Sequence, residues 1–341
     1  MTMLDTQAPS RQFAQLKRMV AARRVLEPQP RFYACRGIVN AGLLTTSLAG
    51  ALIAEDPIWR GTSAVFMAFV VGQIAMVGHD AGHNQLFRSA RTNHLAGLLL
   101  ANLFVGISFG FWVHKHNRHH ARPNQLGFDP DIDMKVHAYC DEQLHQRPAL
   151  LRPLVKYQAL LLFPLFVFES LSLKIDGLAF LARRRQIRWW KTEWVLLLLS
   201  HVGLGALLWY AMGLWAAVVF YAIQQGALGL YLGLLFAPNH LGMPVLPAGP
   251  AKDYLWRQLI TTRNLRPHPL TDYVWGPLAY QIEHHLFPRI PFNRLREARS
   301  IVKPFCEERG LPYHEVGAVA SFVEVLRALH RASAPLRRQA N

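Results

Sequence analysis

Residues 62–83 read TSAVFMAFVVGQIAMVGHDAGH, an apolar run that ends directly in a pair of histidines. The run 62–78 carries no charge and is close to the length of about 20 residues that a helix needs to cross a bilayer. His79 and His83 are spaced i and i+4, which places both imidazoles on one face of a helix, about 6 Å apart along its axis. Alone, this pair is as compatible with core packing as with metal binding. The stretch predicts a transmembrane helix with two histidines at its exit.

Other apolar stretches extend this prediction to the whole chain, 52% of whose 341 residues are hydrophobic. Stretches 37–54, 194–212 and 214–237 are also long enough to span a bilayer, the first with help from flanking residues. Stretches 95–113 and 157–173 are interrupted by Gly or Pro, so each is compatible with a span, a re-entrant piece or an interfacial helix. The sequence predicts an all-α integral membrane protein with about four transmembrane helices.

The formal net charge of +16 is distributed beside these spans. Cations concentrate before the first span and in 183–191, while 55–61 contains only Arg60, so the positive-inside rule places the N-terminus in the cytoplasm. Residues 79–193 and 238–341 then share the cytoplasmic face as a helical cap. We expect a cytoplasmic segment 1–36, a membrane domain 37–320 and a C-terminal helix or tail 321–341, in an inner or plasma membrane. Because topology accounts for the basic excess, nucleic acid is not expected as a partner.

Histidines form two further groups on this predicted face. His116, His119 and His120 follow an apolar run and share one helix face, where unpaired imidazoles would be costly unless something binds them. A third group, His284 and His285, lies far downstream, and His240 follows the last span. Eight histidines from four places can thus converge, which favours two metals with open positions over one structural zinc. The three cysteines form no CxxC pair and indicate no thiolate site.

The groups HDAGH (79–83), HNRHH (116–120) and QIEHH (281–285) resemble the three histidine boxes of the membrane fatty acid desaturases. PNQLGFDPDI (123–132) and FAPNH (236–240) fit the same pattern, and Gln281 resembles the front-end branch and its bacterial acyl-CoA or acyl-lipid relatives. The residues before the third box, GPLAYQ (276–281), depart from the GGLNxQ expected there, which weakens any inference about double-bond position.

The resemblance implies an O2-dependent desaturase that introduces a cis double bond into a long acyl chain at a site with two irons. The implied ligands are His79, His83, His116, His119, His120, His240, Gln281, His284 and His285, with the histidines also counted as catalytic. Asp80, Glu283 and Asp129 are expected to accept ring N–H groups of these histidines. The substrate would be a membrane lipid or an acyl-CoA. No HPGG haem motif occurs, so electrons are expected from a reductase and a separate ferredoxin, rubredoxin or cytochrome b5-like carrier.

Alternative functions remain open at this point. A hydroxylase or ketolase on the same scaffold would use the same ligands, and product analysis alone distinguishes it. A membrane haem protein would need facing histidines inside the spans, where only His201 lies. A metal carrier would place ionisable residues along a transmembrane path.

Overall fold

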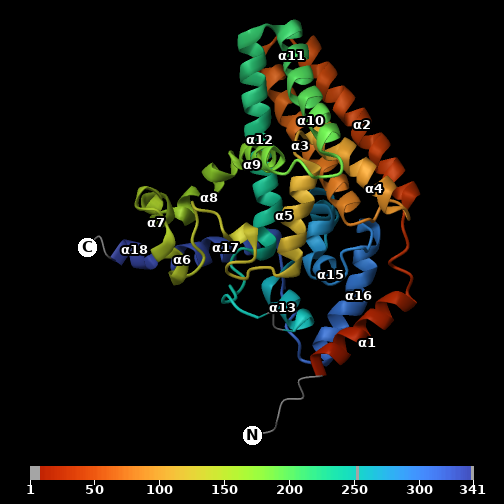
Figure 1. Ribbon diagram of the computed structural model, residues 1–341, viewed down its shortest axis with the longest axis vertical. Coiled ribbons are helices and arrows are strands. Elements are labelled where there is room, and N and C mark those ends of the chain that lie inside the picture. The colour runs from red at the N-terminus through yellow and green to blue at the C-terminus, as the bar shows by residue number, and fades with distance from the viewer. Residues whose placement is uncertain (1–7, 251–252, 339–341) are drawn as a thin grey trace. The chain divides into compact units, whose positions relative to one another are not determined.

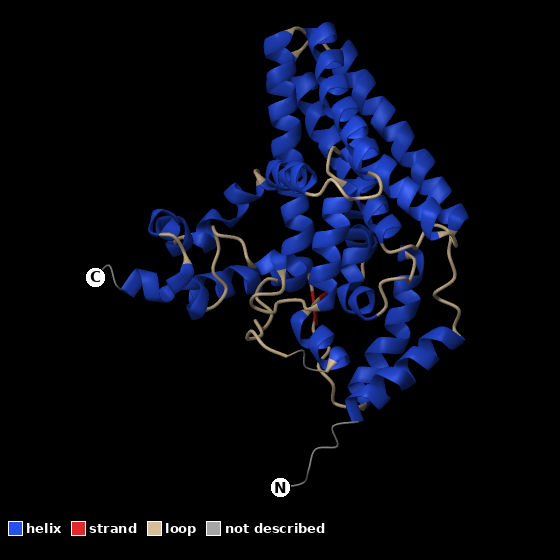
Figure 2. Ribbon diagram, in the orientation of Figure 1, coloured by secondary structure: helices blue, strands red, loops and turns tan. Residues whose placement is uncertain are grey.

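A computed structural model describes residues 8–250 and 253–338, and most of them are helical (Figure 2). The chain forms two compact units that are each discontinuous in sequence. Unit 1 comprises residues 1–27, 115–162 and 235–341, and unit 2 comprises residues 28–114 and 163–234. Helices α5, α8 and α12 contribute residues to both units.

Unit 2 contains the long apolar helices (Figure 1). Its elements are α2 (Pro30–Ile53), α3 (Pro57–Gly82), α4 (Ala90–Gly97), the π-helix η1 (Leu98–Val105), the first half of α5 (Phe109–Ala121), the end of α8 (Gln158–Phe166), α9 (Glu169–Arg183), α10 (Trp190–Leu198), the π-helix η4 (Leu199–Gly203), α11 (Leu204–Met212) and most of α12 (Leu214–His240). In Figure 1, α2 and α3 run side by side, and they are in extensive contact.

Within the described residues, four helices are long and apolar enough to cross a membrane, at Pro30–Ile53, Pro57–Gly82, Trp190–Met212 and Leu214–His240. They confirm the four predicted spans and extend the first two at their N-terminal ends. The second span begins where Asp56 accepts hydrogen bonds from the N–H groups of Ile58 and Trp59, with Pro57 in the first turn. Both features stabilise a helix start, since the first N–H groups have no partner within the helix.

The predicted stretch 95–113 is bent rather than straight. The segment Ala90–Val105 meets α5 at 110°, and Gly106 at the bend has a φ of 76°. A Cβ on Gly106 would lie 2.8 Å from the His201 ring, so only glycine fits there. Beyond the bend, the fully buried carboxylate of Glu193 accepts hydrogen bonds from Ser108 Oγ at 2.7 Å and Gly110 N at 3.2 Å. A carboxylate at a helix N-terminus is stabilising, so Glu193 anchors the start of α5.

The second ambiguous stretch, 157–173, is also broken. Residues Ala149–Lys156 meet α8 at 97°, and α9 begins only at Glu169. Neither stretch is a straight span.

Unit 1 contains shorter helices and one small parallel sheet (Figure 2). Its elements are α1 (Ala8–Ala22), the last half of α5, the 3-10 turn η2 (Pro130–Ile132), α6 (Asp141–Gln146), η3 (Ala149–Leu151), α7 (Arg152–Lys156), the start of α8, the end of α12, α13 (Tyr254–Thr261), β1 (Asn264–Leu265), α14 (Pro269–Trp275), η5 (Gly276–Tyr280), α15 (Gln281–Leu286), α16 (Phe292–Glu308), β2 (Glu315–Val316), α17 (Ala318–Ala332) and α18 (Ala334–Arg338).

The core of unit 1 packs α1, α13, α15 and α16 around buried residues such as Leu16, Leu259, Ile282 and Phe305. Strands β1 and β2 pair Asn264 with Glu315, and this pairing fixes the position of the chain just after α13. The fully buried Arg263 donates to the carbonyls of Pro238 and Leu241 and pairs with Glu324 of α17 at 2.6 Å. Arg263 therefore caps the carboxyl end of α12, where His240 lies.

Candidate metal centre

Seven of the nine predicted ligands lie in unit 1, at the ends of three helices. His116, His119 and His120 occupy the last two turns of α5, with the Nε2 atoms of His116 and His120 3.0 Å apart. His284 and His285 lie on α15 and are fully buried. The rings of His120 and His284 are 4.8 Å apart between centroids, and those of His120 and His285 stack at 4.1 Å. The second and third boxes therefore form one imidazole cluster.

His240 joins this cluster from the end of α12. Its Nε2 lies 3.2 Å from His119 Nε2 and 2.9 Å from the side-chain amide of Gln281. Its Nδ1 lies 2.9 Å from the Thr261 carbonyl, which can only accept, so Nδ1 carries the hydrogen. The lone pair of His240 is thereby directed at His119 and Gln281.

Asp129 orients His119 from behind. His119 Nδ1 lies 3.0 Å from both Asp129 carboxylate oxygens, and the backbone N–H groups of Asn124 and Asp131 hold that carboxylate in place. Asp131 stands beside His119 at 3.3 Å and forms an ion pair with Lys115. Burial opposes ionisation of Asp131, but Lys115 and His119 outweigh it and hold the pKa of Asp131 well below its usual range.

Gln258 of α13 orients His285. Its Oε1 lies 3.0 Å from His285 Nδ1, and its Nε2 donates to the His120 backbone carbonyl at 2.9 Å. Since Nε2 of an amide is the donor, Oε1 is the acceptor and His285 carries its hydrogen on Nδ1. The Nε2 lone pair of His285 is then available to a metal. One buried glutamine connects the second box to the third.

Glu283 has a different set of contacts from the one expected. Its carboxylate accepts hydrogen bonds from Asn264 Nδ2 at 2.7 Å and from the Tyr313 hydroxyl at 2.8 Å. Asn264 Oδ1 in turn accepts from the N–H of Ile282 inside the third box. Burial raises the pKa of Glu283 to about 7, although both hydrogen bonds favour its ionised form. Glu283 thus ties α15 to β1 and to Tyr313.

The first box lies in unit 2, at the end of α3. The rings of His79 and His83 are 4.8 Å apart between centroids, and His79 Nδ1 lies 3.0 Å from Asp80 Oδ1. The Tyr33 hydroxyl contacts Asp80 Oδ2 and Gln85 Oε1, each at 2.9 Å. Asp80 therefore orients His79 as Asp129 orients His119.

The donor set in unit 1 fits a metal cation. His119 and His240 both direct Nδ1 at an oxygen acceptor, so two Nε2 lone pairs face each other at 3.2 Å. Such lone pairs repel unless a metal ion or a proton lies between them. Ligand atoms of His119, His240 and His285 lie within 4.8 Å of one another, as do those of His119, Asp129 and Asp131. Imidazole suits iron, zinc, copper and nickel alike.

Comparison with known proteins identifies the family. The model of the fatty acid desaturase family matches residues 57–317, which is most of the chain. The chain belongs to the fatty acid desaturase family.

Relatives of this desaturase-family chain include enzymes from plants and animals. It is 27% identical over 339 residues to an acyl-lipid (9-3)-desaturase of Physcomitrium patens, covering 93% of this chain and 62% of the moss protein. It is 28% identical to a Delta(5) fatty acid desaturase of Caenorhabditis elegans, covering 89% of this chain and 70% of that protein. It is 30% identical to a Delta(6)-fatty-acid desaturase of the same nematode, covering 75% of this chain and 60% of that one.

The sequence pattern did not reveal three residues that support the ligands of this family member. Gln258, Thr261 and Asn264 come from the segment between α12 and α14, which contains no histidine box. The only available signal was the concentration of uncharged polar residues after Trp256 in RQLITTRN. His201 contacts the Gly106 carbonyl at 3.1 Å.

Proposed function

We propose that this protein is an O2-dependent fatty acyl desaturase that uses two irons to introduce a cis double bond into a long acyl chain. The observation that carries the proposal is the buried convergence of imidazoles from α5, α12 and α15, with their outer nitrogens held by Asp129, Thr261 and Gln258. The names of the relatives, which are all desaturases, favour dehydrogenation over hydroxylation.

The proposed ligands are the eight histidines of the sequence pattern and Gln281. When bound, the iron pair would supply the oxidising power needed to break an unactivated methylene C–H bond, using O2 and two external electrons. The residues of the chain have three tasks in this reaction. The histidines bind metal, Asp80, Asp129 and Gln258 fix which ring nitrogen carries hydrogen, and complete burial of His284 and His285 excludes water.

The remaining parts of the proposal concern location and partners. The four apolar helices place the protein in a membrane, and we propose that the histidine boxes lie on its cytoplasmic face. The substrate is an acyl chain on a lipid or on coenzyme A. A reductase and a small carrier, such as a ferredoxin, a rubredoxin or a cytochrome b5-like protein, supply the electrons.

The test combines product analysis with metal analysis. The chain is expressed in a host, and fatty acids from host lipids are compared by gas chromatography–mass spectrometry with those of cells carrying an empty vector. We expect a new unsaturated product, two irons per purified chain, and loss of both in His119→Ala and His284→Ala. The exposed His330 serves as a matched control, because His330→Ala should keep iron and activity. Full activity in a preparation containing zinc alone, or a hydroxylated product, would overturn the proposal.

A further inference from the structure

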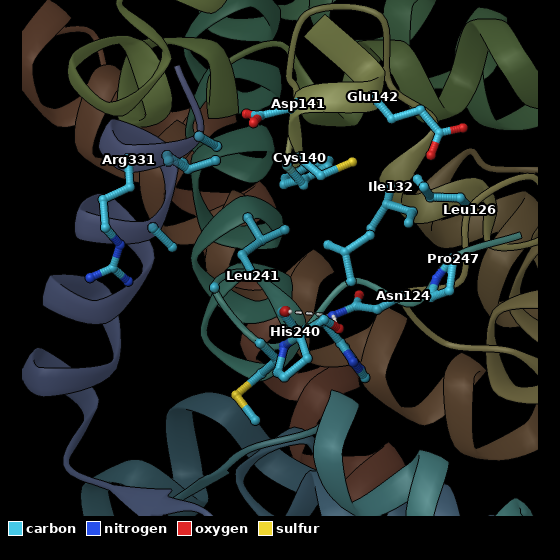
Figure 3. Close-up of a pocket in the computed structure, with 18 residues that line it drawn as sticks. Asn124, Leu126, Ile132, Cys140, Asp141, Glu142, His240, Leu241, Pro247 and Arg331 are labelled. Carbon is cyan, nitrogen blue, oxygen red and sulfur yellow. Dashed lines mark hydrogen bonds between the residues drawn. The ribbon is translucent and has the colours of Figure 1, made fainter. Parts of the chain in front are cut away.

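A pocket in unit 1 leads to His240 and carries unpaired charges at its rim. Its volume is about 770 Å³, and its lining comes from the loops after α5 and α12 and from α6 and α17 (Figure 3). His240 and Asn124 lie at one end, where Asn124 donates to the His240 carbonyl at 3.0 Å. The pocket therefore reaches a residue of the proposed metal centre.

Much of the pocket lining is apolar. Leu126, Ile132, Leu241 and Met243 line the pocket, along with Val245 and two prolines. The two loops that carry these residues are held together by backbone hydrogen bonds from Leu126 N to Leu246 O at 3.0 Å and from Leu246 N to Asn124 O at 2.8 Å. A preformed apolar channel of this kind suits a hydrocarbon chain.

The rim is charged, with the two signs on different helices. Arg331 extends from α17, whereas Asp141 and Glu142 begin α6, and Figure 3 shows the cation and the carboxylates on different sides of the pocket. All three side chains are exposed, and among residues 8–250 and 253–338 none of them forms an ion pair or a side-chain hydrogen bond. One cation and two carboxylates give the rim a net charge of −1, which disfavours a polyanion such as coenzyme A.

We propose that this pocket binds the phosphoethanolamine headgroup of a phospholipid, whose acyl chain then passes along the apolar wall toward His240. The phosphate would contact Arg331 and the ammonium group would contact Asp141 and Glu142. A primary ammonium fits better than a quaternary one, because quaternary ammonium groups are usually bound by several faces of Trp, Tyr or Phe, and Tyr139 is the one residue of these types among the described lining residues. The inference rests on the proposed desaturase function and selects a lipid-linked substrate over acyl-CoA.

Cys140 provides a direct readout, because it lines the pocket and is partly exposed. The exposed Cys35 in α2 is an internal control, and the third cysteine, Cys306, is buried with a pKa raised by burial to about 12, so it should not react. The rate of maleimide labelling at each cysteine is measured by mass spectrometry in detergent, with dihexanoyl phosphatidylethanolamine as the probe. We expect the probe to slow labelling of Cys140 and to leave labelling of Cys35 unchanged.

Charge variants and matched controls define the headgroup. Arg331→Gln, and separately Asp141→Asn with Glu142→Gln, should raise the probe concentration for half-protection roughly 2- to 5-fold, the upper part of the range for an exposed ion pair. Arg327→Gln, one turn earlier on α17, and Glu307→Gln on α16 are exposed controls outside the pocket and should leave that concentration unchanged. Dihexanoyl phosphatidylglycerol, which has no ammonium, should protect Cys140 less well.

Either of two results would overturn the headgroup proposal. One is no protection of Cys140 by the probe at any concentration that leaves labelling of Cys35 unchanged. The other is equal protection by phosphatidylethanolamine, phosphatidylglycerol and coenzyme A, or equal protection in Arg331→Gln and Arg327→Gln. Labelling requires neither iron nor electrons, so these results do not depend on desaturase activity. A protein that protects Cys140 as expected but yields no unsaturated product would refute the proposed function alone.

Discussion

Replacing Gln258 by leucine should weaken metal binding without disrupting the ligands themselves. The leucine is similar in size and removes two hydrogen bonds, one to His285 Nδ1 at 3.0 Å and one to the His120 carbonyl at 2.9 Å. Gln258 is fully buried, so water cannot replace the lost partners. Leaving two buried polar groups without these bonds costs about 1–3 kcal/mol each, or about 2–6 kcal/mol of folding free energy.

The effect on the metal is separate from this loss of stability. Without Gln258, the His285 ring can rotate and can place its hydrogen on Nε2, which removes the lone pair needed for coordination. Loss of a group that orients a ligand histidine weakens metal binding about 10- to 100-fold. That range corresponds to about 1.4–2.7 kcal/mol of binding free energy.

Apo-protein prepared by chelation is titrated with Co²⁺ and the visible absorption of the bound ion is recorded. We expect Gln258→Leu to raise the dissociation constant by that factor, and Gln258→Glu, which keeps an oxygen acceptor for His285 Nδ1, to recover most of the affinity.

Gln158 offers a matched control. It is also a fully buried glutamine of unit 1, bonded to Ala138 and to the Leu329 carbonyl. Gln158→Leu should lower stability at least as much as Gln258→Leu yet leave Co²⁺ affinity unchanged. Equal affinities in wild type and Gln258→Leu, or equal losses in the two leucine variants, would refute the assigned role of Gln258.

Three further predictions concern topology, electron supply and pH. Cysteines introduced at Ala90 and Ser300, both exposed, should react with an impermeant maleimide from the cytoplasmic side only; labelling from opposite sides would contradict the predicted topology. Purified protein with lipid substrate and O2 should be inactive until a reductase and an electron carrier are added, and repeated turnover with NADPH alone would reveal an electron-entry site within this chain. Burial lowers the pKa of His137 from 6.5 to about 4. Between pH 6.5 and pH 4, His137 is therefore protonated in the unfolded chain but remains neutral in the folded chain. Stability should fall over that interval by about 3 kcal/mol, at 1.36 kcal/mol per pH unit. Thermal unfolding should show a smaller fall in His137→Gln, whereas a variant at the exposed His145 should behave like the wild type.

The sequence was sufficient to predict the spans and the groups of histidines. Both depend on spacing along a helix, which is a local property: uninterrupted apolar runs give the spans, and i, i+3 and i+4 spacing places His116, His119 and His120 at the end of α5. Asp129 was a reasonable candidate for a similar local reason, because only a short loop separates it from the second box. Its two contacts with His119 agree with that expectation.

The sequence was not sufficient where the chain bends or returns from a distance. The 110° bend after η1 depends on Gly106 and on the contact of Glu193 with Ser108 and Gly110, more than 80 positions away. The sequence also did not reveal the hydrogen-bond partners of Glu283 in the third box. Glu283 was expected to contact a ring nitrogen, but Asn264 and Tyr313 hydrogen-bond to its carboxylate, and both become its neighbours through the pairing of β1 with β2.

The segment 253–264, which lies outside the boxes, supplies hydrogen bonds that orient ligands of the unit 1 centre. The Gln258 side chain on α13 meets His285 and the His120 carbonyl, and the backbone carbonyl of Thr261, at the end of the same helix, accepts from His240. Asn264, immediately after the helix, bonds to the third box from β1. A ligand histidine supplies a donor atom, but the direction of its lone pair is set by the group on its other nitrogen. Substitutions within boxes should therefore remove metal, whereas substitution of the Gln258 side chain should leave every ligand present and reduce affinity.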